Sequence, residues 1–414
     1  MQFNLKTNNN WYDILQYTAV LLVAAAIPVK WRFGLLASLV LGVTTVVKIV
    51  SQRKIGNPNL QPLSVIALCS PIIYWAVLVF SLLWSRDLNM GWELVTRKAI
   101  LLVFPLCFLL SDTSYFSFRK LRGIGYALLV SVCGVFFCFI IAANIAKLQG
   151  VGFLSFYNDY ISQNHRHHAY SAMYVVVAIF FVYYELYTYW TWLKAWQKIV
   201  LLFAVVTLVV DVVLVNSRAG IVVMLVSVLV CILHLAITKH SWRLGLGVGS
   251  LFLSVLAGAT HLIPSYTNRV SETIKDYQED TRTSIYRCNW HAVCKSPVIG
   301  YGIGDAHAAQ VKTYKEEKFE AGINSGYNAH NQYLDSMLSA GFFGLLSLFF
   351  FLLSSEIVAL WNRSHFTFWI TVLSGIVIIN LLFESMLERQ MGLLFIGGLY
   401  SVMILLLSTE AKRY

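Results

Sequence analysis

The chain has 414 residues, of which 58% are hydrophobic and only 12% charged, and its mean hydropathy is +0.67. A water-soluble domain normally carries about 25% charged residues, so this composition excludes one and predicts a polytopic membrane protein. The net charge of +11 comes from basic residues scattered among expected helix ends. Because they do not form one aromatic-rich patch, a nucleic-acid partner is not expected.

Apolar runs long enough to cross about 30 Å of hydrocarbon recur along the chain. They predict an all-α integral membrane protein with about twelve transmembrane helices. Nine of these helices belong to residues 1–262 and three to residues 332–414. The expected helices cover residues 11–29, 33–50, 63–84, 95–111, 123–146, 168–190, 197–216, 219–238, 243–262, 332–360, 365–383 and 391–409.

Residues 263–331 are the one long connection between the expected helices. A structureless loop of this length is uncommon, so we expect it to be partly helical and to carry function. If the N-terminus is cytoplasmic, the short segments on that side hold more Lys and Arg than the opposite ones. This bias favours both termini inside, which puts residues 263–331 outside.

Arginines mark two places near the expected outer face. Arg218, in NSRAGI (216–221), begins a helix, and its guanidinium could bind phosphate oxygens in a bidentate manner. A snorkelling arginine at the membrane interface would have the same position. Arg282 and Arg287 lie in the long connection, five residues apart, so they only partly share a helix face. The alternative for each is a solvated loop arginine.

A third polar place opens the tenth expected helix. In NAHNQYLDSMLSAGFFGLL (328–346), His330 and Asn331 directly precede the apolar run. The helix dipole and nearby arginines oppose protonation of the imidazole, and a neutral histidine can act as a general base. The alternative is a simple polar cap, since Asn is common at helix starts. All three places fall on the same expected face, which favours one shared site.

Two further groups of polar residues could carry chemistry, but each also has a simpler structural interpretation. HRHH (165–168) collects imidazoles, but no Cys or cluster of carboxylates accompanies them. We therefore expect no metal site there, and favour a polar loop that lines an acceptor cleft. Glu384 and Glu388, one helical turn apart, could be a paired acid/base device. We favour instead an internal ion pair with Arg389 or with a site arginine.

Two of these motifs resemble one known family. The pattern H-N, nine residues, then G-x-x-G runs from His330 and Asn331 to Gly341 and Gly344. It resembles the signature of the O-antigen ligase and O-antigen polymerase superfamily of bacterial membrane glycosyltransferases. NSRAGI, with Ser217 and Arg218, resembles that family's S-R-x-G segment at the start of a helix.

The long connection resembles the same family. Its pattern of an arginine about fifteen residues before a proline and a G-x-G-x-G-type turn matches Arg282, Pro297, Gly300, Gly302 and Gly304. Tyr286 stands where the family more often has tryptophan, and Arg287 is the alternative equivalent of the loop arginine. HHAYSAMY (167–174) and ESMLERQMG (384–392) resemble the family more weakly. They add four residues that we expect to contact substrate, which are His168, Tyr170, Glu384 and Arg389.

The resemblance implies transfer of a glycan from an undecaprenyl-diphosphate carrier to an acceptor hydroxyl, without metal or other cofactor. His330, Arg218 and Arg282 would be catalytic, and Arg287, Asn331 and Ser217 would bind substrate. The implied location is the bacterial inner membrane, with the site facing the periplasm, and the helices would hold the polyprenyl tail. Ligation of O-antigen to lipid A-core in lipopolysaccharide biosynthesis is the leading expectation. Repeat-unit polymerase, protein O-oligosaccharyltransferase and, in another class, a transporter of lipid-linked sugars stay open.

Overall fold

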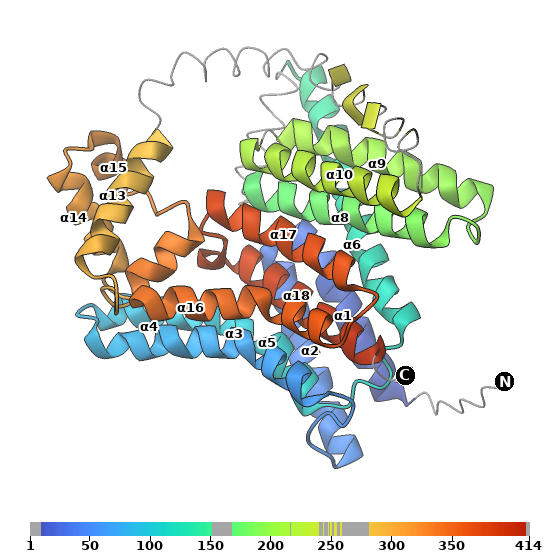
Figure 1. The fold of residues 1–414 in the computed structure, drawn as a ribbon, viewed down its shortest axis with the longest axis horizontal. Coiled ribbons are helices and arrows are strands. Elements are labelled where there is room, and N and C mark those ends of the chain that lie inside the picture. The colour runs from blue at the N-terminus through green and yellow to red at the C-terminus, as the bar shows by residue number, and fades with distance from the viewer. Residues whose placement is uncertain are drawn as a thin grey trace.

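The computed structural model describes residues 10–150, 168–215, 217–239 and 281–410, with scattered positions between 243 and 258. All regular elements in these ranges are helical (Figure 1). Up to residue 150 they are α1 (Trp11–Val29), α2 (Trp31–Gln52), α3 (Pro62–Phe80), η1 (Ser81–Trp84), α4 (Leu88–Lys98), η2 (Ala99–Leu102), α5 (Val103–Leu110) and α6 (Phe118–Leu148). The others are α8 (His168–Tyr189), α9 (Ala195–Val215), α10 (Arg218–Thr238), α13 (Thr281–Lys295), α14 (Ala306–Glu316), α15 (Glu320–Ser325), α16 (Gln332–Trp361), α17 (Thr367–Phe383), η4 (Met386–Glu388) and α18 (Gln390–Glu410).

The described part of the chain has the helices of a multi-pass membrane protein. Nine are long and apolar enough to cross a bilayer, and they are α1, α2, α3 with η1, α6, α8, α9, α10, α16 and α18. The apolar helix α17 is shorter, with 17 residues. The helix expected at 243–262 lies mostly outside the described residues, so the total of about twelve stays a prediction.

The single helix expected over 95–111 is wrong. That stretch is divided among the end of α4, the 3₁₀ turn η2 and the short helix α5. Pro105, near the start of α5, has no N–H to donate to the carbonyl of Leu101, which weakens a continuous α-helix at this point. The interruption also ends α4 at the buried Lys98.

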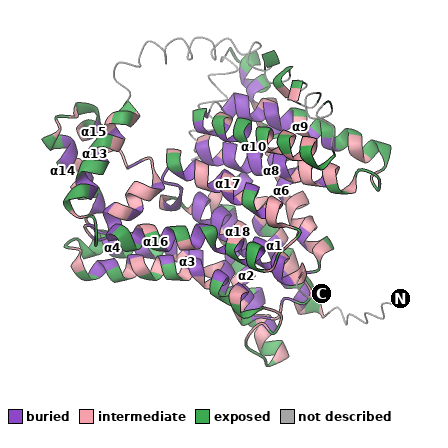
Figure 2. Ribbon diagram, in the orientation of Figure 1, coloured by how far each residue is buried: buried purple, intermediate pink, exposed green. Residues whose placement is uncertain are grey.

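The helices pack around α18, most of whose span is buried. Figure 1 shows α8, α9 and α10 as a layer on one side of the bundle, with α17 next to them. On the other side α16 runs along α3, and α1 packs against α2 and α6. Figure 2 shows buried residues along the enclosed helix faces and exposed ones on the outer faces. The outer faces carry large apolar side chains such as Leu36 and Val43, as expected of lipid contact.

Polar contacts distinguish the two ends of the bundle. Gln61 and Asn362, expected on one side of the membrane, share a hydrogen bond of 3.2 Å. At the other end, the carboxylate of Asp305 accepts a hydrogen bond from the backbone N–H of Arg86, at 2.5 Å. The helices α13, α14 and α15 of the long connection lie together at that end (Figure 1). Which side of the membrane each end faces stays a prediction.

Helix α16 is broken near its N-terminal end. Ala340 and Gly341 leave the helical conformation, and Gly341 has φ 60° and ψ −146°, a combination open essentially only to glycine. The break frees backbone groups that the turn at residues 297–301 satisfies. Phe342 N–H donates to the carbonyl of Pro297 at 2.8 Å, and Tyr301 N–H donates to Leu338 at 2.7 Å.

The glycines of the GYGIGD turn make this docking possible. A Cβ on Gly300 would overlap the carbonyl of Leu338 and the backbone of the α16 break. On the other side of the turn, a Cβ on Gly304 would overlap the carbonyl of Asp87. The turn is therefore packed backbone to backbone between α16 and the connection from η1 to α4. Gly300 and Gly304 are needed for this close packing, because a side chain at either position would overlap the neighbouring backbone.

We expect Gly341→Ala to lower stability, because alanine would be strained at this φ and its Cβ would overlap the carbonyl of Val298. The strain alone costs about 1–3 kcal/mol. Gly375→Ala is the matched control, since Gly375 lies in α17 with no atom within 4 Å of a built Cβ. Thermal unfolding in detergent should show a lower Tm for Gly341→Ala alone. Equal melting of the two variants would contradict this account of the break.

Candidate active site

His330 faces a buried carboxylate. Its Nδ1 lies 3.1 Å from Oε2 of Glu384, and the two side chains are 24% and 2% exposed. Glu384 follows the last turn of α17 in an extended conformation. If the carboxylate is ionised and the imidazole neutral, Nδ1 donates in this contact and Nε2 carries the lone pair. A carboxylate in this position can orient a histidine ring.

Asn331 caps the helix that follows it. Its side-chain oxygen accepts hydrogen bonds from the N–H groups of Tyr333 at 2.9 Å and Leu334 at 3.1 Å. His330, just before the cap, has the positive φ of 44°. The side chain of Asn331 therefore contributes to fixing where α16 begins, and with it the position of the imidazole. Contact of Asn331 with substrate stays a prediction.

Tyr286 connects α13 to both sides of the His330 contact. Its hydroxyl lies 3.1 Å from the carbonyl oxygen of His330 and 2.9 Å from that of Leu382. The phenol carries one hydrogen, so it donates to these carbonyls as a shared donor. Tyr286 thus fixes α13 against the ends of α16 and α17. This is the position at which the resembling family more often has tryptophan.

The two loop arginines lie on different faces of α13. Arg282 is partly buried and precedes Tyr286 by four residues, which places it on the same face about 6 Å away along the axis. Arg287 is exposed, on the side that also carries the exposed Trp290. The opposite side is buried through residues such as Ile285. Helix register therefore puts Arg282, and not Arg287, on the face of α13 that carries Tyr286, and a role for either arginine stays a prediction.

The start of α8 packs on the segment that follows Glu384. The hydroxyl of Tyr170 lies 3.4 Å and 3.3 Å from the carbonyl oxygens of Ser385 and Met386. Tyr170 is fully buried, so its position does not support the expected contact with substrate. Arg389, at the end of this segment, is exposed. Gly392 allows the close packing, because a Cβ there would overlap the carbonyl of Met386.

The start of α10 lies at the same end of the bundle. Nδ1 of His168, two residues before Tyr170, is 2.6 Å from the carbonyl oxygen of Val215, the last residue of α9. Ser217 is buried and caps α10, accepting a hydrogen bond of 3.1 Å from Gly220 N–H. Arg218 follows as the first residue of the helix and is exposed. His330, Glu384, His168 and Arg218 thus share one end of the protein.

A buried polar network supports this end of the bundle. Lys98 of α4 pairs with Glu388 and donates a hydrogen bond of 2.9 Å to the carbonyl of Leu387. Gln332, two residues after His330, accepts a hydrogen bond of 2.7 Å from Leu387 N–H and donates one of 3.2 Å to Asp335. The network joins α4, the first turn of α16 and the segment that begins at Glu384.

Glu388 is held ionised within this network. Burial alone would raise its pKa, but the Lys98 ammonium and hydrogen bonds from Asp335 and Lys98 hold the pKa of Glu388 below its ordinary value. The ion pair expected for Glu388 therefore forms with Lys98, and not with Arg389. Sequence analysis missed Lys98, Gln332 and Asp335. A lysine inside a stretch expected to cross the membrane was the available signal, because such residues seldom face lipid.

Metal ligands were not expected, and the described residues contain no group of three or more His, Cys, Asp or Glu that could hold a metal ion. Of the HRHH segment, only His168 lies within the described residues.

Lys98→Met should destabilise the protein strongly, because it leaves the carboxylate of Glu388 without its cation. Breaking a buried ion pair costs about 3–5 kcal/mol. The double variant Lys98→Met with Glu388→Gln removes both charges and should recover part of this loss. Thermal unfolding in detergent tests both expectations. Arg97→Met is the matched control, since Arg97 pairs with Glu93 at the exposed surface of the same helix. A Tm loss no larger for Lys98→Met than for Arg97→Met would contradict the assignment.

A comparison with protein families finds a match. Residues 203–349 match the family model described as O-antigen ligase. The matched part contains Arg218, Arg282 and His330, while Glu384 and Lys98 lie outside it. No match was found among the curated proteins. The chain is therefore similar to the O-antigen ligase family over residues 203–349, about a third of its length, which supports the resemblance that its motifs carry.

Proposed function

We propose that this protein transfers a glycan from an undecaprenyl-diphosphate carrier to an acceptor hydroxyl, and that the acceptor is the lipid A-core. The observation that carries the proposal is the contact between His330 Nδ1 and Glu384, and it is supported by Tyr286, which contacts the His330 carbonyl from the face of α13 that also carries Arg282. Such an arrangement suits proton removal next to an anionic leaving group. The site would face the periplasm of a bacterial inner membrane.

In the proposed reaction, the acceptor oxygen attacks the anomeric carbon of the donor sugar. The bond between that carbon and the diphosphate oxygen breaks, and the diphosphate leaves with the electron pair. Nε2 of His330 takes the hydroxyl proton, and the Glu384 carboxylate stabilises the imidazolium that forms. One direct displacement inverts the configuration at the anomeric carbon.

The guanidinium groups of Arg218 and Arg282 would meet the charge that develops on the diphosphate. A guanidinium binds phosphate oxygens with two parallel hydrogen bonds, which a lysine ammonium cannot reproduce. In this role the arginines supply the positive charge that a metal ion supplies in other diphosphate chemistry. We therefore propose that the reaction needs no metal.

The direct test is a reaction of purified protein with an undecaprenyl-diphosphate oligosaccharide, with and without lipid A-core, in the presence of a metal chelator. A shifted lipid A-core band that requires the acceptor supports ligation. Longer lipid-linked chains without acceptor would replace ligation with repeat-unit polymerisation. No product in either arm would overturn the proposal, and protein glycosylation or transport of the lipid-linked sugar would take its place.

His330→Ala should lower kcat by about 10²- to 10⁴-fold, the usual contribution of a general base. Glu384→Gln should also lower kcat, because a neutral amide cannot stabilise the imidazolium. Donor binding, measured separately, should be nearly unchanged in His330→Ala. His291→Ala is the matched control, since His291 is paired with Glu317 on the exposed side of the long connection. Unchanged turnover in His330→Ala would remove the proposed base.

Arg218→Lys and Arg282→Lys should each lower kcat by roughly 10²- to 10³-fold, as does loss of one group that stabilises transition-state charge. Arg287→Lys serves as the matched control, because Arg287 lies on the exposed face of α13. Initial rates at saturating donor concentration, measured for each of the three variants, test these expectations. If Arg287→Lys loses activity and Arg282→Lys does not, the choice of loop arginine is reversed.

A further inference from the structure

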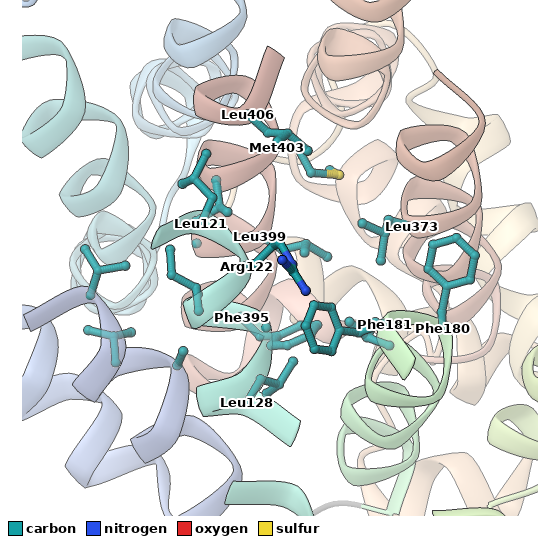
Figure 3. Close-up of a pocket in the computed structure, with 18 of the residues that line it drawn as sticks. Leu121, Arg122, Leu128, Phe180, Phe181, Leu373, Phe395, Leu399, Met403 and Leu406 are labelled. Atoms are coloured by element: carbon teal, nitrogen blue, oxygen red, sulfur yellow. The ribbon is translucent and has the colours of Figure 1, made fainter. Parts of the chain in front are cut away.

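A cavity of about 190 Å³ lies inside the bundle, away from the candidate active site. Helices α1, α6, α8, α17 and α18 enclose most of it, and Figure 3 shows side chains such as Leu399 and Phe181 at its wall. The lining is almost entirely apolar. Water needs two to four polar partners to stay in such a space, so it does not suit this cavity. Its natural occupant is a hydrocarbon chain.

The charge at the cavity wall is already neutralised. Arg122 carries the only charge among the described lining residues, and its Nε donates to Glu185 at 2.9 Å. The hydroxyl of Tyr126 donates to the same carboxylate at 2.7 Å. The guanidinium also stacks on the ring of Tyr189, 3.7 Å from its centre. Arg122 therefore does not provide a site for an anionic headgroup.

One end of the cavity does offer such a site. Phe118 and Phe366, which both line the cavity, stack there with ring centres 5.4 Å apart. Beside this pair, Arg119 and Arg363 are exposed. The acid at this rim, Glu410, already accepts a backbone hydrogen bond of 2.9 Å from the residue before Phe366. Glu410 keeps its charge in this contact, so the two arginines against one carboxylate leave the rim with an excess of positive charge. The rim belongs to the end of the bundle opposite His330.

The other end of the cavity is closed by aromatic packing. Phe395 lines the cavity, and its ring centre lies 4.6 Å from that of Tyr174 on α8. The hydroxyl of Tyr174 donates to the carbonyl of Met391 at 3.1 Å. This contact separates the cavity from the segment that begins at Glu384. A lipid whose headgroup lay near the candidate active site would have to displace it.

We propose that the cavity binds one acyl chain of an anionic phospholipid, whose phosphate lies between Arg119 and Arg363. Guanidinium groups bind phosphate oxygens strongly, and basic pockets at helix ends bind anionic lipids. The lipid belongs to the leaflet at the basic end, opposite the candidate active site. Its chain fills the space between α6 and α18 and so contributes to the packing of the bundle. The proposal does not depend on the reaction.

The test uses the full-length protein in detergent micelles, with phosphatidylglycerol and phosphatidylcholine of identical chains as probes. Native mass spectrometry measures the lipid bound, and lipid analysis identifies what co-purifies. Wild-type protein should bind phosphatidylglycerol in preference to phosphatidylcholine. Arg119→Gln with Arg363→Gln should weaken phosphatidylglycerol binding by roughly 10- to 30-fold, the effect of losing two basic contacts. It should leave phosphatidylcholine binding unchanged.

A second variant tests whether the acyl chain binds in the cavity. Ala24→Phe places a ring in the cavity and should reduce binding of both lipids, with Leu399→Phe as the alternative if Ala24→Phe does not fold. Val130→Phe is the matched control, since Val130 lies on α6 with 69% exposure and does not line the cavity. Lys54→Gln with Lys194→Gln removes two exposed charges expected at the same end and controls for net charge.

Three results would overturn the proposal. Equal binding of phosphatidylglycerol by Ala24→Phe and Val130→Phe would exclude the chain site. An unchanged preference for phosphatidylglycerol in the double arginine variant would exclude the headgroup site. Co-purification of an isoprenoid lipid in place of phospholipid would assign the cavity to a different occupant.

Discussion

A polar group that is buried away from water must find its partner within the protein. The junction between the first turn of α16 and the segment after α17 depends on this constraint. Lys98 neutralises Glu388 there, and Gln332 satisfies the backbone of Leu387. Glu384 begins the same segment and contacts His330. The position of the imidazole therefore rests on a short irregular segment that buried charges and hydrogen bonds hold in place.

The need to pair buried backbone groups also explains several residues of the motifs that resemble the O-antigen ligase family. The break at Gly341 frees backbone groups, and the glycine-rich turn of the long connection supplies their partners without side chains in the way. Gly344 is equally confined, since a Cβ there would overlap the carbonyl of Ser336. Asn331 caps the helix. Of the motif that starts at His330, only the imidazole combines partial exposure with a contact suited to proton transfer.

The bundle separates two kinds of chemistry. At one end, irregular segments and helix starts carry His330, Glu384, Arg218 and Arg282, and the contact between His330 and Glu384 lies there. At the other end and in the interior, an apolar cavity runs between helices and ends beside exposed arginines. Aromatic contacts, such as that between Tyr174 and Phe395, lie between these regions. A protein that handles lipid-linked substrates needs such a division, because the polar reaction and the apolar chains require different surroundings.

The sequence by itself determined the membrane class and the position of most helices, because these depend on composition and on the length of apolar runs. The range expected for the first helix, 11–29, is that of α1. The capping role of Asn331 was also among the alternatives from sequence, because an Asn directly before an apolar run is a common helix cap. Tertiary structure decided the rest. The contacts His330 to Glu384 and Lys98 to Glu388 span 54 and 290 residues, and only packing shows that Arg282 shares the Tyr286 face of α13 while Arg287 is exposed. Such choices follow from packing between distant segments, which local periodicity does not specify.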